Sequence, residues 1–112
     1  MRRKFTTPAT LLGQSRKERL LARARRARRR GKHRRAMIAL REAACLQGDD
    51  ARLWTLYAAQ CLRAGHRDEA VQALGQATWL RQRARDMARA RVTSLLLEQV
   101  RHGEGVEHLH AA

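Results

Sequence analysis

The chain of 112 residues repeats part of its own pattern after 34 residues. Small or apolar residues, and the glycines between them, recur at this one spacing. The recurring pairs are Leu20 and Trp54, Ala24 and Ala58, Ala27 and Cys61, Gly31 and Gly65, Ala36 and Ala70, Leu40 and Leu74, and Ala43 and Ala77. Because a fixed period of about 20 to 50 residues is typical of stacked supersecondary units, this repetition constrains the fold strongly.

Each unit is predicted to contain two helices that meet at its glycine. Ser15 and Glu18 have the spacing of a capping box, and Gly31 can end the helix by adopting a left-handed conformation without steric cost. The last stretch continues the register with Ala88, Val92 and Leu95 in the apolar places, but has no second helix after it. The expected helices span residues 16–30, 34–46, 51–64, 67–80 and 83–101.

The composition agrees with an all-α fold. Ala, Leu and Arg dominate, only 4% of the residues are aromatic, and one is proline. We expect one helical domain over residues 15–101, a basic flexible tail over 1–14 and a flexible tail over 102–112. Large residues such as Trp54, and also Trp79, are expected to fill the space between helices that approach at alanines.

Residues 51–80 resemble a tetratricopeptide repeat, and the stretch from Gly65 to Ala70 (Gly-x-x-Asp-Glu-Ala) is close to that family's pattern. The first unit departs from it, since Arg23 stands where the family prefers leucine and no proline closes either unit. The residues that carry the resemblance are Trp54, Tyr57, Ala58, Cys61, Gly65, Ala70, Leu74 and Ala77. The resemblance implies an α-solenoid of two helix-turn-helix repeats plus a C-terminal capping helix.

The positive charge is concentrated in the first third of the chain. Residues 1–35 hold fifteen Lys or Arg and one acid, whereas residues 36–112 hold ten Arg and nine acids. Such asymmetry indicates an anionic partner. An acidic protein segment is the leading interpretation, so that the chain would act as an adaptor or small chaperone. Contact with the nucleic-acid backbone is the alternative, and an anionic membrane is disfavoured because the apolar side of the first helix is needed for packing.

The resemblance also implies a concave groove lined by the first helix of each unit. The partner-binding arginines expected there are Arg25, Arg28, Arg29, Arg52, Arg63 and Arg89, accompanied by Leu21, Thr55, Ala59, Thr93 and Leu96. A second group recurs at three- and four-residue steps and is expected to form a basic stripe along the first helix. It comprises Arg16, Arg19, Arg23, Arg26 and Arg30.

The sequence contains no pattern that indicates catalysis. Phosphate-binding loops, nucleophile elbows and paired metal-ligand motifs are missing, so no enzyme activity, cofactor or metal is expected. Cys45 and Cys61 lie in apolar helical stretches and are interpreted as reduced thiols, which favours a cytoplasmic location. The run Leu95–Leu97 is too wide for one buried stripe, and a self-association contact of the C-terminal helix is one interpretation of it.

Overall fold

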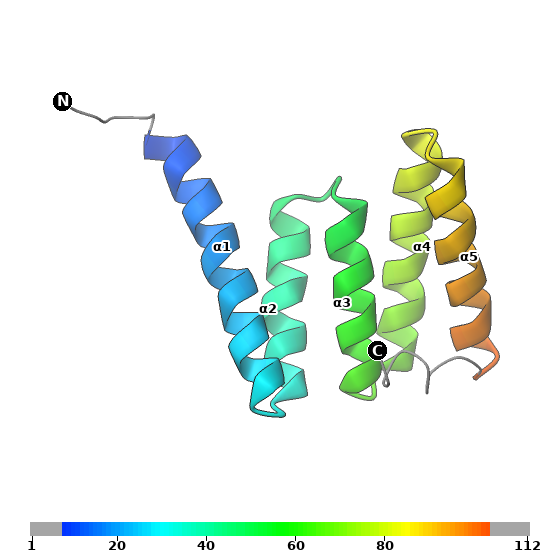
Figure 1. The fold of residues 1–112 in the computed structure, drawn as a ribbon, viewed down its shortest axis with the longest axis horizontal. Helices are drawn as coiled ribbons and strands as arrows, with labels where there is room; N and C mark the ends of the chain where they lie inside the picture. Colours follow the sequence, from blue (N-terminus) through cyan, green and yellow to red (C-terminus); the bar gives the residue numbers. More distant parts are fainter. Residues whose placement is uncertain (1–7, 104–112) are drawn as a thin grey trace.

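The structure, a computed structural model, describes residues 8–103, with side chains from residue 16 onward. Every regular element in that range is an α-helix (Figure 1). The helices are α1 (Pro8–Arg29), α2 (His33–Leu46), α3 (Ala51–Arg63), α4 (Arg67–Arg83) and α5 (Met87–Arg101). Each helix packs against the next one in the chain, with α1, α3 and α5 nearer the viewer than α2 and α4. The predicted all-α class is therefore confirmed for these residues.

Two glycines end the first and third helices in the same way. Gly31 has a φ of +73° and Gly65 a φ of +81°, a region that side chains other than hydrogen disfavour. After α1, the Lys32 amide donates to the Ala27 carbonyl at 2.8 Å. After α3, the His66 amide donates to the Cys61 carbonyl at 2.8 Å. These are Schellman turns 34 residues apart, so the predicted role of both glycines is confirmed.

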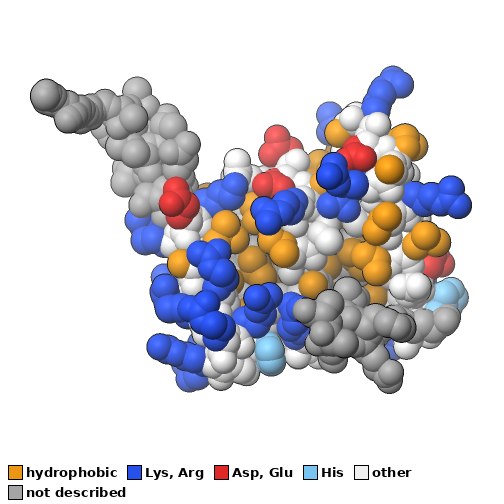
Figure 2. Space-filling model, viewed as in Figure 1, with side chains coloured by type: hydrophobic (Ala, Val, Ile, Leu, Met, Phe, Trp, Pro, Cys, Tyr) orange, Lys and Arg blue, Asp and Glu red, His pale blue; other side chains and the backbone are white. Residues whose placement is uncertain are grey.

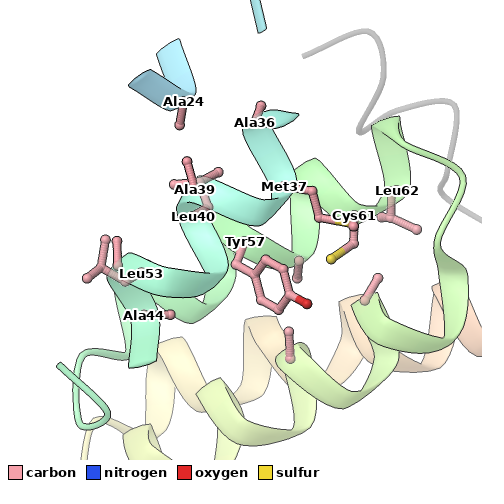
Figure 3. Packing of buried hydrophobic residues seen from close by; sticks show 14 of the residues in the cluster. Ala24, Ala36, Met37, Ala39, Leu40, Ala44, Leu53, Tyr57, Cys61 and Leu62 are labelled. Atoms are coloured by element: carbon pink, nitrogen blue, oxygen red, sulfur yellow. The ribbon is translucent and has the colours of Figure 1, made fainter. Parts of the chain in front are cut away.

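The core is built from alanines at the helix contacts and a few larger side chains between them (Figure 3). Ala36, Ala43, Ala70 and Ala77 are each 0% exposed. Residues 34 apart share this burial, because the small side chains occupy the same places in both helix pairs. Trp54 is half-buried, and its indole Nε1 donates to the Gly48 carbonyl at 3.0 Å, which ties α3 to the turn before it.

Asp50 and Asp86 cap the helices that follow them. The Asp50 carboxylate accepts from the Leu53 amide at 3.2 Å, and the Asp86 carboxylate accepts from the Arg89 amide at 3.3 Å. Such caps satisfy amides that have no partner inside the helix. At the other end of α5, Arg67 of α4 donates to the carbonyls of Val100 at 2.8 Å and Arg101 at 2.9 Å.

The predicted register of the last helix is wrong. Ala88, Val92 and Leu95 are exposed, whereas the buried residues of α5 are Ala90, Thr93 and Val100. The reason is that α4 continues to Arg83, and Arg85 at a φ of 61° makes the turn that a glycine makes elsewhere. The capping aspartates Asp50 and Asp86 are therefore 36 residues apart instead of 34.

Two further expectations differ from the structure. The first helix begins at Pro8, so Ser15 lies inside α1 and cannot cap it. Trp79 is 49% exposed and does not fill the core; the guanidinium of Arg83 lies 4.7 Å from its ring centre. The predicted tails fall largely on residues 1–7 and 104–112, which lie outside the described residues.

Replacing Gly65 by alanine should destabilise the fold by about 1–2 kcal/mol, because the new Cβ must adopt a left-handed conformation. The matched control is Gly48→Ala, at a turn glycine with an ordinary φ and no heavy atom within 4 Å of the added Cβ. Its free energy of unfolding should change by less than about 0.5 kcal/mol. Urea unfolding followed by circular dichroism measures both, and equal effects would contradict the assigned turn.

Burial raises the pKa of the Cys61 thiol to about 11, from an ordinary value of 9.0. The folded state therefore keeps its proton to higher pH than the unfolded state. The stabilisation from the neutral thiol is complete below pH 9.0 and is lost as the pH rises through about 11. Thermal unfolding across this range should show a smaller loss for Cys61→Ala, which places at this position the residue found at the equivalent Ala27. Parallel pH dependence in both proteins would contradict the prediction.

Candidate anion-binding groove

The arginines of α1 point away from the core because the alanines and leucines of the same helix face α2. Leu20, Ala24 and Ala27 are buried, and the basic residues between them are exposed. Figure 2 shows Lys and Arg side chains gathered over α1 and the neighbouring part of α3, beside apolar side chains at the centre of this face. Packing of the apolar stripe thus decides which arginines come together.

A groove of about 220 Å³ runs between α1 and α3 over the end of an α2 side chain. Four arginines surround it, two from each of the outer helices, and leucines form part of its floor. Its lining comprises Leu21, Ala24, Arg25, Arg28, Leu40, Arg52, Leu56, Gln60 and Arg63. On each helix these residues follow steps of three and four, which keep side chains on one face.

The lining contains four guanidinium groups and no carboxylate. Arg63 is the most constrained of them, since its pKa is lowered first by burial and then by the positive charge of Arg28. Arginine remains charged under these conditions. The lowered pKa therefore indicates that positive charge is held in the groove against an electrostatic cost, which an anion would relieve.

Gln60 lies at the bottom of this groove and is 1% exposed. Its Nε2 donates to the His33 carbonyl at 2.9 Å and lies 3.2 Å from His33 Nδ1. Because a carbonyl can only accept, this bond fixes which end of the amide faces α2. The remaining oxygen, Oε1, has no hydrogen-bond partner among the described residues. A buried acceptor without a donor is costly, so the groove also offers a place for an N–H or O–H group.

A second basic surface lies between α1 and the outer side of α2. It encloses a more open hollow of about 410 Å³, which has one acid, Glu42, in its lining. Its basic residues are Arg23, Arg26, Arg30, Lys32 and Arg35. Arg16 forms an exposed ion pair with Glu42 at 3.7 Å, and Arg19 is exposed. Three residues of the expected stripe thus line one hollow, and Arg16 contacts the same acid.

The structure brings Arg25, Arg28, Arg52 and Arg63 together, as the groove interpretation requires. Arg29 is exposed outside the lining, and Arg89 on α5 pairs with Asp86 at 3.0 Å. That pair and the amide of Arg89 lower the pKa of the Asp86 carboxyl, which suits a helix cap.

Other expected groove residues do not line it. Thr93 is 0% exposed and donates to the Arg89 carbonyl at 3.0 Å inside its own helix. Leu96 is half-buried on α5, outside the lining, as a consequence of the shifted register. On α3 the groove is lined by Leu56 and Gln60 instead of Thr55 and Ala59. The four-residue steps from Arg52 to Leu56 and Gln60 carried the signal that could have identified them.

Metal chemistry finds no basis in residues 16–103, where no three His, Cys, Asp or Glu side chains cluster closely enough to hold an ion. Among the described helices, none combines the length and the apolar character needed to cross a bilayer. Comparisons with protein-family models, curated proteins and solved structures return no match. The chemistry of the groove itself is therefore the basis for a functional proposal.

Removing one groove charge should stabilise the free protein at low ionic strength. In Arg28→Gln the repulsion on Arg63 is relieved, so the melting temperature should rise. The rise should shrink as added salt screens the charges, over a distance of about 8–10 Å at physiological ionic strength. Arg29→Gln, one position along the same helix and outside the lining, is the control and should show a smaller rise. Identical shifts would mean that Arg28 and Arg63 do not interact.

Proposed function

We propose that this chain is a tetratricopeptide-like repeat protein that binds an acidic segment of another protein in the groove between α1 and α3. The repeat assignment is supported by the two Schellman turns 34 residues apart and by the matching burial of the alanines. The terminal helix α5 would then be the capping helix of the array. The binding assignment rests on one observation, the convergence of four arginines on a groove lined without acids.

The chemistry of the groove suits a peptide. Guanidinium groups bind carboxylates through paired hydrogen bonds, and they are more easily desolvated than ammonium groups. Leu21 and Leu56 supply apolar surface between the charges, which suits a segment that alternates acidic and apolar residues. Gln60 Oε1 supplies an acceptor that a main-chain N–H can fill. A protein segment offers all three groups at once.

The size of the groove argues against a small-molecule site. Its volume of about 220 Å³ is below the range of roughly 300–1,000 Å³ typical of ligand pockets. It is also open, with charged side chains at its rim. Such a groove can receive a few side chains of a segment lying across it. Adaptor or assembly functions require this kind of contact, and we propose no catalytic activity.

Nucleic acid is the second candidate, and the hollow beside Arg23, Arg26 and Arg30 favours it. Together with Lys32 and Arg35, these residues place five positive charges on the other flank of α1. Phosphates could contact both flanks of the helix. Neither lining includes an aromatic side chain on which a base could stack. Binding of this kind would depend on the backbone alone and would have little sequence preference.

Fluorescence anisotropy with a labelled peptide of alternating Glu and Leu tests the groove. Arg28→Glu should weaken binding at least about tenfold, equivalent to about 1.4 kcal/mol, because the reversed charge faces the carboxylates. Arg29→Glu makes the same change in net charge outside the groove and should have a much smaller effect. A peptide of alternating Gln and Leu should bind weakly. Equal losses in the two variants would contradict the proposed site.

The same variants distinguish the nucleic-acid candidate. Single-stranded RNA bound along the whole basic surface should respond similarly to Arg28→Glu and Arg29→Glu. The logarithm of its affinity should fall steeply with the logarithm of salt concentration, by roughly 0.7 for each phosphate contact. Tight RNA binding with this slope, together with weak peptide binding, would favour nucleic acid and overturn the peptide proposal.

A further inference from the structure

One face of α5 is apolar and exposed. Met87 is 61% exposed, Val92 55% and Leu95 57%, all on the side of the helix that faces away from α4. Figure 2 shows apolar side chains over α5, at the right of the molecule. The small residues Ala88 and Ser94 line a shallow hollow beside this face. Small side chains allow another helix to approach closely, so the face has the shape of a helix-packing surface.

We propose that this face, defined by Met87, Ala88, Arg91, Val92, Leu95 and Glu98, binds the same face of a second copy, with the two α5 helices antiparallel. This inference does not depend on the groove or on its ligand. In a two-fold dimer the same patch serves both protomers, so it must be complementary to itself.

The charges beside the apolar residues provide this complementarity. Arg91 and Glu98 are seven residues, or about two helical turns, apart on the same flank of the face. An antiparallel neighbour centred near Leu95 places Arg91 of one protomer opposite Glu98 of its partner, and the symmetry repeats the pair. Arg91 has no ion-pair partner within residues 16–103, so it is available for this contact.

Glu98 is not committed elsewhere by strong contacts. Its carboxylate lies 3.5 Å from Arg101 and 3.6 Å from His102, and all three side chains are more than half exposed. Exposed pairs of this kind contribute about 0–1 kcal/mol, so an intermolecular pair can replace them at small cost.

The distribution of charge favours a second copy as the occupant. Residues 36–112 carry ten Arg and nine acids, so this part of the chain is nearly neutral. The helix with most of the excess positive charge, α1, lies at the opposite end of the molecule from α5 (Figure 1). Two copies joined through α5 therefore keep their strongly basic ends apart and bring together surfaces without net repulsion.

Sedimentation equilibrium of the full chain over a wide concentration range tests the dimer. The wild-type protein should form dimers, and Leu95→Glu should raise the dissociation constant at least about tenfold. Leu46→Glu, at a leucine of α2 that is 43% exposed, is the matched control and should leave the dimer intact. A wild-type chain that stays monomeric, or a dimer that resists Leu95→Glu, overturns the proposal.

Charge reversal and crosslinking test the orientation. Arg91→Glu and Glu98→Arg should each weaken the dimer, and the double variant R91E/E98R should restore it. In a Cys45→Ser background, Leu95→Cys should form a disulfide-linked dimer, because this position lies near the two-fold axis. Met87→Cys should not, since the two copies of that residue would be more than about 20 Å apart along the helices. Crosslinking at both positions, or no rescue by the double variant, overturns the antiparallel arrangement.

Discussion

Contact between helices at alanine is the interaction on which this structure depends. Ala36, Ala43, Ala70 and Ala77 have no exposed surface, and Ala58 has almost none. With so little side chain between them, the helices pack closely, and each gains dispersion contacts along its whole length. The larger residues Leu53, Tyr57 and Leu74 then fill the remaining volume. The burial of the alanine faces leaves the basic residues no place except the outer surface.

The groove follows from this packing and has an energetic cost of its own. Arg63 is partly buried near Arg28, and Gln60 keeps an acceptor without a donor. Neither feature stabilises the free protein. Local choices that disfavour the unbound fold are common at binding sites, where a partner supplies the missing charge or hydrogen bond. By contrast, the ion pairs of Arg16 with Glu42 and of Lys17 with Asp50 are surface contacts of small value.

Sequence reasoning predicted the parts that local chemistry controls. The all-α class, the glycine turns at Gly31 and Gly65, and four of the six expected partner-binding arginines agree with the structure. The start of α1 at Pro8 was missed, because a capping-box spacing at Ser15 does not exclude a helix that continues through it. The groove floor was placed one position away from Leu56 and Gln60, since periodicity defines a face more accurately than it selects a residue.

The register of α5 could not be predicted for a different reason. Arg85 adopts a left-handed conformation that arginine disfavours, so the turn before α5 had no glycine to mark it. Tertiary packing of the longer α4 determines where that turn falls, and the partial exposure of Trp79 belongs to the same extension of α4. Both depend on how the last two helices meet.

The guanidinium of Arg67 gives those two helices a common fate. It binds the carbonyls of Val100 and Arg101, so the first turn of α4 holds the last turn of α5. A terminal helix usually frays from its free end, and its amides then exchange with solvent early. Here fraying must also release a charged donor of the preceding helix. The C-terminal hairpin should therefore open as one cooperative unit, with the last turn of α5 protected nearly as well as the start of α4.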